Sequence, residues 1–252
     1  FPSCDDANFP GTTGVGALPL NNPNGIRWST AIGYLGSARH RLNLTIRGDV
    51  FVKRILFDMS GDRPRATGVE VVSDEDSFVL HADNVILSAG AVASPQLLML
   101  SGIGPAQHIS TYGIEPILDL PGVGQNLSDH PMLYVTWRTN PEVSLDALGP
   151  RIQVGLRYTA EESKLDNDMI VYMMAAASDR PERGGLRSNP IGIQANVCIN
   201  LAKGKGEVRL NSGDYRDQPH LDYNYLTDEE DRRRFRHAIY MLVGLENHPA
   251  MA

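Results

Sequence analysis

The segment Gly90–Gly104, GAVASPQLLMLSGIG, holds the residues whose types and spacing best suit ligand chemistry. It follows an apolar run at 84–89 that is typical of a β-strand. Ser94 is a suitable N-cap, Pro95 suits the first position of a helix, and Gly102 is placed to end that helix. A strand followed by a glycine and a helix N-terminus brings backbone N–H groups and a positive dipole end together. Such a junction suits a phosphate group or a flavin edge.

The seven histidines are the other candidates for chemistry. A neutral imidazole near pH 7 can accept the proton of a reacting hydroxyl group. His130 lies in an Asp-His-Pro sequence, and we interpret it as structural. The remaining six have no partner motif: His40, His81, His108, His220, His237 and His248. We therefore predict no catalytic histidine among them.

Composition excludes several classes of protein. The 252 residues suffice for one large domain or two modest ones, and 42% hydrophobic with 21% charged residues is typical of a globular protein. A net charge of −7 argues against nucleic-acid binding, and no apolar run approaches the ~20 residues of a transmembrane helix. Cys4 and Cys198 lack the spacing of metal ligands, so we predict no metal site and interpret them as reduced thiols of a cytoplasmic protein.

The elements that would position Gly90 are mostly short strands. Residues 1–30 are rich in Gly, Pro and Asn and are predicted as loop, and a helix is predicted over 27–35 with Ser29 or Thr30 as its cap. Strands are predicted at 42–46, 51–57, 68–72, 78–80 and 85–87. Short antiparallel strands that lead into an apolar strand and a helix favour a β-meander inserted in a Rossmann-like sheet.

The character of the chain changes after Pro131. Strands are predicted at 132–138, 168–175, 191–199 and 207–210, with a helix within 145–158 and an amphipathic helix over 228–245. The acidic run 228–231 is interpreted as a solvated helix start. This half is predicted to be an antiparallel sheet flanked by helices, which makes the whole chain a mixed α/β (α+β) fold.

The run at 90–104 resembles the second sequence signature of the glucose–methanol–choline (GMC) family of FAD-dependent oxidoreductases. Every defined place of that signature is satisfied: Gly90, Ala91, Ser94, Pro95, Leu97, Leu98, Ser101, Gly102, Ile103 and Gly104. The segments 119–131 and 206–226 are similar to further motifs of the family. Within it, the chain most resembles choline-dehydrogenase-like bacterial members.

The resemblance implies a division of the chain and a set of cofactor contacts. Residues 1–131 would be the central part of the FAD-binding region, 132–205 the substrate-binding region, and 206–252 the start of the C-terminal region. The backbone of Val52 would meet the FAD adenine. Ala89 and Gly90 would run close to the ADP portion, where a missing side chain lets the backbone approach.

The resemblance also implies an activity, which is oxidation of the CH–OH group of a small-molecule alcohol with hydride transfer to the flavin. Electrons would pass to oxygen or to another acceptor. If that acceptor is in a membrane, the protein could associate with the membrane surface through it. The pyrophosphate-binding GxGxxG would lie upstream of Phe1 and the catalytic histidine downstream of Ala252. We therefore expect an internal fragment with no catalytic residue of its own, which alone binds FAD poorly. The alternatives are a GMC-type hydroxynitrile lyase and a non-catalytic remnant of the family.

Overall fold

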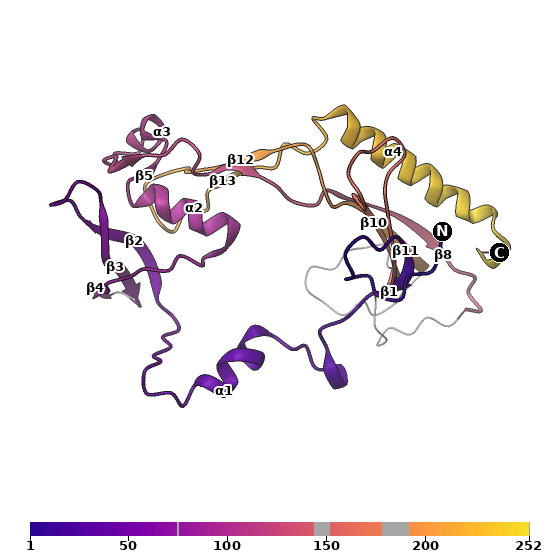
Figure 1. The fold of residues 1–252 in the computed structure, drawn as a ribbon, viewed down its shortest axis with the longest axis horizontal. Helices are drawn as coiled ribbons and strands as arrows, with labels where there is room; N and C mark the ends of the chain where they lie inside the picture. The colour runs from indigo at the N-terminus through magenta and orange to yellow at the C-terminus, as the bar shows by residue number, and fades with distance from the viewer. Residues whose placement is uncertain (75, 144–151, 178–191, 252) are drawn as a thin grey trace. The chain divides into compact units, whose positions relative to one another are not determined.

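The computed structural model describes residues 1–252 except 75, 144–151, 178–191 and 252 (Figure 1). The chain forms two compact units, and both are discontinuous in sequence. Unit 1 comprises Phe1–Trp28, Asp129–Gly204 and Tyr225–Ala252, and unit 2 comprises Ser29–Ser128 and Lys205–Asn224. These units group residues by contact, whereas the three regions predicted above follow family likeness. The boundaries 1–131, 132–205 and 206–252 therefore stay a prediction.

Unit 2 contains the predicted β-meander. The strands β2 (Phe51–Asp58), β3 (Arg65–Ser73) and β4 (Asp76–His81) form an antiparallel sheet in the order β2-β3-β4. The helix α2 (Gly90–Leu100) packs beside β2, and the N–H group of Ile55 donates to the Ser101 hydroxyl at 2.8 Å. This buried hydrogen bond fixes the C-terminal end of α2 against the meander.

The helix α2 begins four residues before the predicted cap, so the prediction of Ser94 as N-cap and Pro95 as first residue is wrong. Gly90 has φ +87°, and this left-handed conformation turns the chain into the helix before Ser94 is reached. Pro95 lies inside the helix, where its ring nitrogen donates no hydrogen bond. The predicted end is confirmed, because Gly102 has φ +83° and a Cβ there would lie 2.7 Å from the Glu115 carbonyl oxygen.

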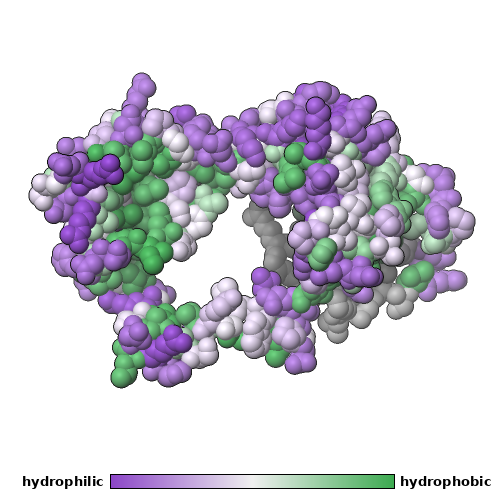
Figure 2. All heavy atoms as spheres, viewed as in Figure 1, coloured by the Kyte–Doolittle hydropathy of each residue, from purple (hydrophilic) through white to green (hydrophobic). Residues whose placement is uncertain are grey.

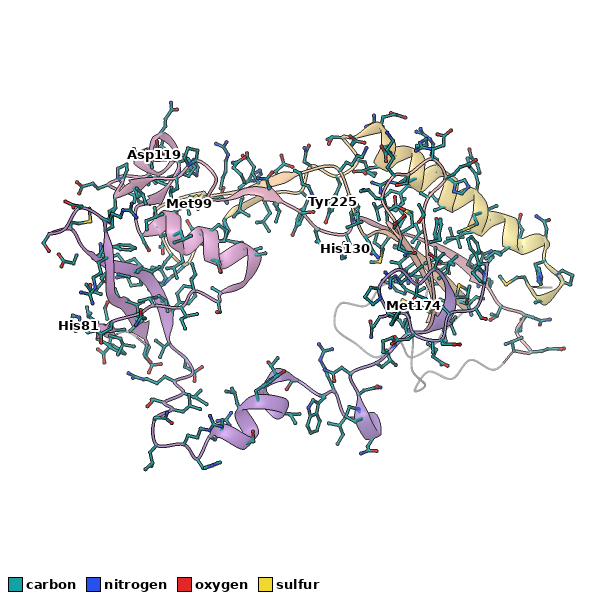
Figure 3. All side chains as sticks on the ribbon, viewed as in Figure 1. His81, Met99, Asp119, His130, Met174 and Tyr225 are labelled. Atoms are coloured by element: carbon teal, nitrogen blue, oxygen red, sulfur yellow. The ribbon has the colours of Figure 1, made fainter. Side chains whose placement is uncertain are left out.

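The rest of unit 2 packs around a small hydrophobic core. It contains the parallel pair β5 (Ile103–Gly104) and β6 (Leu118–Asp119), the helix α3 (Ala106–Ser110), and a sheet of β7 (Gln125–Leu127), β12 (Gly206–Arg209) and β13 (His220–Asp222). Met99 of α2, labelled in Figure 3, is fully buried in this core with Ile109, Leu127, Val208 and Leu210. The segment 205–224 is thereby tied to α2, although over a hundred residues separate them in the chain.

Two predicted strands of unit 2 are wrong. Residues 42–46 and 85–87 lie outside the strands of the described chain, and Leu42 and Ile86 are exposed at 104% and 88%. A strand requires a hydrogen-bonded neighbour, and an apolar run alone does not supply one. The apolar residues of these segments therefore remain extended or turned without joining a sheet.

Unit 1 is built on a five-stranded antiparallel sheet. Its order is β1-β9-β10-β11-β8, with β1 Gly14–Ala17, β8 Met132–Arg138, β9 Ile152–Tyr158, β10 Met169–Ala177 and β11 Gly192–Ile199. An antiparallel sheet was predicted for the half after Pro131, but the edge strand at Gly14–Ala17 lies in residues 1–30, whose prediction as loop is wrong there. The helix α4 (Glu229–Gly244) covers one face of this sheet (Figure 1). The helix predicted within 145–158 is wrong where the structure describes it, because 152–158 is β9; residues 145–151 lie outside the described residues.

The remaining helices are short. The predicted helix at 27–35 begins later, as a π-turn η2 (Ala31–Leu35) that continues into α1 (Gly36–Ala38), and the Ser29 hydroxyl accepts from the Ile32 N–H group at 3.3 Å. Single turns occur at η1 (Pro23–Gly25), η3 (Leu245–Asn247) and η4 (Pro249–Met251). None of the helices in the described residues combines the length and apolar character needed to cross a bilayer.

Candidate cofactor-binding site

Unit 2 contains an apolar pocket of about 390 Å³ bounded by the meander, the segment 85–89 and α2. Figure 2 shows hydrophobic residues gathered over these elements. Its walls are mainly aliphatic and aromatic side chains, among them Phe51, Val69, Ile86, Leu97 and Tyr215. Flat apolar walls of this kind suit an aromatic ring system.

Two of the three predicted cofactor residues line this pocket. Val52 comes from β2 and Ala89 from the end of the segment 85–89, so elements 37 residues apart in sequence meet at one cavity. Gly90 is the next residue and starts α2. Apart from its chain neighbours and its own helix backbone, a Cβ on Gly90 would meet no atom of the described residues within 4 Å, so its φ of +87° is the feature that favours glycine here.

The N-terminus of α2 lies beside the pocket and has no capping side chain. Ala89 is the N-cap, no side chain of the described residues makes a cap hydrogen bond there, and the first turn contains no acidic residue. The first N–H groups of a helix have no partner within the helix and carry a positive partial charge. An apolar pocket next to an open helix N-terminus fits the two chemical halves of an ADP group, a ring and a phosphate.

Tyr215 is a wall of the pocket that the sequence did not predict. Its ring centroid lies 5.1 Å from that of Phe51, and the Arg216 guanidinium lies 4.7 Å from the Tyr215 centroid. The loop that carries Tyr215 is attached to α2, because the Gln96 side-chain amide donates to the Asp217 carbonyl at 2.8 Å. Only the tertiary fold brings this loop to α2, and no local pattern around Tyr215 signals it.

The charged side chains next to the pocket are paired with one another. Glu70 of β3 accepts hydrogen bonds from Lys53 and from Arg54, each at 2.6 Å. The hydrogen bond from Lys53, followed by that from Arg54, lowers the pKa of Glu70 to about 2. These charges therefore stabilise the meander, and the uncapped helix end is the feature that suits an anion.

Unit 1 contains a buried ionic cluster that the sequence interpretation missed. The Arg234 guanidinium lies 2.6 Å from the Asp168 carboxylate and also pairs with Asp231, and all three side chains are buried. Asp231 belongs to the acidic run predicted as solvated, and that prediction is wrong for this residue. Burial raises the pKa of Asp231, but hydrogen bonds from the Gly204 and Lys203 N–H groups and from Arg234 outweigh it and lower the pKa.

Among the histidines, His108 has a structural role and His130 lies exposed. The Nε2 atom of His108 accepts from the Leu210 N–H group at 3.0 Å, which joins α3 to β12. Burial, together with the nearby Arg209, lowers the pKa of His108 and keeps it neutral for this bond. His130 is exposed, and its main-chain N–H donates to Asp129 (Figure 3). Cys4 and Cys198 are both buried free thiols, as predicted.

Comparison with known proteins connects this architecture to one enzyme family. The model of the GMC oxidoreductase family matches residues 3–132. The chain is 34% identical to an uncharacterized GMC-type oxidoreductase of Rhodococcus erythropolis, over 97% of this chain and 47% of the relative. It is also 34% identical to an oxygen-dependent choline dehydrogenase of Burkholderia cenocepacia, over 100% of this chain and 48% of the relative.

Solved structures agree with the sequence relatives. The fold superposes on pyridoxine 4-oxidase from Mesorbium loti with a TM-score of 0.81 and 26% identity, over 98% of this chain and 48% of that one. A formate oxidase gives a TM-score of 0.81 at 22% identity, over 97% and 50% of the two chains, which shows the fold alone. The chain spans about half the length of the curated relatives it matches. On the match to residues 3–132, this chain belongs to the GMC oxidoreductase family.

Proposed function

We propose that this chain is the central part of an FAD-dependent oxidoreductase, choline-dehydrogenase-like, that oxidises the CH–OH group of a small alcohol. Family membership supports the proposal. The observation that carries it is local: Val52 and Ala89 line one apolar pocket, and the uncapped N-terminus of α2 follows directly. Apolar walls suit the adenine ring and free backbone N–H groups suit the diphosphate of the ADP portion of FAD.

Each predicted site residue has a proposed part in holding FAD. The backbone of Val52 would hydrogen-bond to the edge of the adenine ring, and Tyr215 would add an aromatic wall. Ala89 and Gly90 would carry the N–H groups that face the phosphate side. Bound FAD supplies the hydride acceptor, so the part left to these residues is binding and orientation.

The remaining regions have proposed parts in the same enzyme. Residues 132–205 would hold the substrate, with 1–131 as FAD-binding region and 206–252 as the start of the C-terminal region. Relatives and structural neighbours named for choline and pyridoxine support a small-molecule substrate. We propose a cytoplasmic location and assign no electron acceptor; oxygen is one option, since relatives are named oxygen-dependent.

Anaerobic flavin reduction tests the activity. The full-length protein that contains this chain is loaded with FAD and mixed with a panel of primary alcohols without oxygen. Bleaching of the flavin absorbance near 450 nm, with the aldehyde as product, is the expected result. Cyanide release from a cyanohydrin without bleaching would replace the proposal with a hydroxynitrile lyase. The absence of both reactions would leave a non-catalytic member of the family.

A second experiment concerns residues 1–252 by themselves. The sequence contains no GxGxxG, the loop that clamps a pyrophosphate in dinucleotide-binding folds. We expect the isolated 252 residues to retain little FAD after purification. A stoichiometric yellow complex would show that the pocket of unit 2 suffices and that the clamp is dispensable.

A further inference from the structure

The helix α4 covers only part of the sheet face on which it packs. It lies mainly over β11 and β8. Four cross-strand partners form one row over this face, from β11 through β10 and β9 to β1: Val197, Val171, Leu156 and Val15. Val197 is 0% exposed and Val171 is 5% exposed, whereas Val15 at the far edge is 38% exposed. The cover that α4 gives therefore ends before the β1 edge of the sheet.

An apolar groove of about 200 Å³ lies over the uncovered part of this face, and we call it the α4 groove. The sheet contributes Val154 and Met173, and the C-terminal end of α4 and the residue after it contribute Met241, Leu242 and Leu245. None of the described residues that line it carries a polar side chain. Val154 and Leu245 are 42% and 37% exposed, so apolar walls of the groove face solvent in this chain.

The size and the walls of the α4 groove do not suit a small molecule. Pockets for small ligands usually measure about 300–1,000 Å³ and contain a few polar groups that orient the ligand. The described walls of this groove provide less volume and no such group. Contiguous exposed apolar surface of this kind is typical of a contact site for another protein segment.

The dimensions of the sheet fit one further helix beside α4. Neighbouring strands lie about 4.8 Å apart, and two packed helices lie about 8–10 Å apart. A helix next to α4 would therefore lie about two strands further along the sheet, which leads from β11 to β9. The strand β9 carries Val154, one of the exposed residues of the groove.

Chain order and chain length indicate where this helix would come from. The helix α4 ends at Gly244, and the next residue, Leu245, already lines the groove. Consecutive helices joined by a short connection commonly pack side by side and antiparallel. The chain covers 47% and 48% of two curated relatives, so a protein of their length has about half of its residues outside this region. A segment that follows residue 252 could reach the groove through a short turn.

We propose that a second amphipathic helix, formed by residues that follow 252 in the full-length protein, packs antiparallel to α4 in the α4 groove. Its apolar face covers Val154 and Leu245 and completes the helix layer on this face of the sheet. The inference concerns the completion of unit 1. It does not depend on FAD binding or on alcohol oxidation, so its test and the test of the proposed function give separate answers.

Thiol accessibility in the full-length FAD-loaded protein tests whether the groove is covered. Val154→Cys and Val79→Cys are treated with a maleimide, and the modified peptides are quantified by mass spectrometry. Val79 of β4 is the matched control, because it is a strand valine with 43% exposure outside the groove. We expect Val154→Cys to react at least about tenfold more slowly in the native protein than in urea, since a covered thiol reacts only after local opening. Val79→Cys should stay within about threefold of its rate in urea. A native rate of Val154→Cys within that same factor would overturn the inference.

Photocrosslinking identifies the segment that covers the groove. Leu245→p-benzoylphenylalanine places a photoreactive ketone at the groove wall, and a mixture of light and heavy isotope-labelled full-length protein is irradiated and digested. We expect a cross-link within one chain, to a peptide that follows residue 252 and has apolar residues at helical spacing. A mixed light–heavy product would assign the groove to a second copy of the protein and overturn the inference. A cross-link to a peptide before Phe1, or to no peptide outside residues 1–252, would also overturn it.

Discussion

The two long helices begin in opposite ways. At α4 the Asp228 carboxylate accepts from the Glu230 N–H group at 2.8 Å, and the first turn contains Glu229, Glu230 and Asp231. At α2 the cap is Ala89, the described part of the chain supplies no side-chain cap hydrogen bond, and the residue that starts the helix is Gly90. One N-terminus is thus neutralised by its own chain, and the other keeps its N–H groups and partial positive charge for a partner.

The difference indicates what each helix does. The start of α4 is bound into the fold, because Asp231 and Arg234 of its first turns form the buried cluster with Asp168. The start of α2 lies at an apolar pocket. Its C-terminal end is anchored to the fold by the buried Met99 side chain and by the hydrogen bond between Ile55 and Ser101. An uncapped helix end costs stability, and a protein tolerates that cost where a ligand completes the cap.

The largest effect is expected at the α4 cluster. Arg234→Met leaves the buried Asp168 and Asp231 carboxylates without their cation, and should lower the free energy of unfolding by about 3–5 kcal/mol. Urea denaturation followed by circular dichroism measures this loss. Arg236→Met, which removes an exposed pair with Glu229, is the matched control and should cost about 0–1 kcal/mol. Equal losses would show that the cluster does not anchor α4.

A smaller effect is expected from the caps themselves. Asp228→Ala removes the acceptor for the Glu230 N–H group and should cost about 1 kcal/mol of stability. Ser94→Ala at α2 should change stability by less than about 0.5 kcal/mol, because Ser94 lies within the helix and caps nothing. Thermal denaturation of the two variants compares the helices directly. A loss at Ser94 as large as that at Asp228 would contradict the assigned start of α2.

Sequence reasoning succeeded for strands that have a hydrogen-bonded neighbouring strand and for the amphipathic helix α4. The strands predicted at 51–57 and 132–138 are confirmed, because neighbouring strands within this chain pair with them, and α4 was predicted from its acidic start and amphipathic repeat. The runs 42–46 and 85–87 carry the same apolar signal without a hydrogen-bonded neighbour. Propensity is local, whereas a sheet requires a partner strand.

The candidate site was predicted only in part, for a related reason. Val52, Ala89 and Gly90 were predicted through resemblance to a family, whose signature the residues near Gly90 satisfy. Tyr215 follows from long-range packing, which no local spacing encodes. The start of α2 was misplaced because Ser94-Pro95 is a strong local cap signal. The helix instead begins four residues earlier, at the left-handed Gly90.

An effect no larger than that of the Asp228 cap is expected in the pH dependence of the meander beside the pocket. The pKa of Glu70 is about 2 in the folded state against 4.5 in the unfolded state, because Lys53 and Arg54 hydrogen-bond to its charged form. A lowered folded pKa gives stability that is fully present above pH 4.5 and is lost as the pH falls toward 2. After screening by solvent we expect a contribution of about 1 kcal/mol.

Glu70→Gln isolates this contribution. The variant should be less stable than the native protein at pH 6 and should lose less stability between pH 4.5 and 2, as followed by urea denaturation. Parallel pH profiles of the two proteins would show that these charges do not stabilise the meander.

FAD affinity of a matched glycine pair tests the central claim most directly. Gly90 (φ +87°) and Gly113 (φ +73°) both have left-handed backbones and open space around the Cβ position, so alanine at either should strain the fold by about 1 kcal/mol. In the full-length apoprotein, FAD titration should give a Kd raised about tenfold by Gly90→Ala, with a change below about twofold for Gly113→Ala. Equal Kd values for the two variants would contradict a cofactor site at the start of α2.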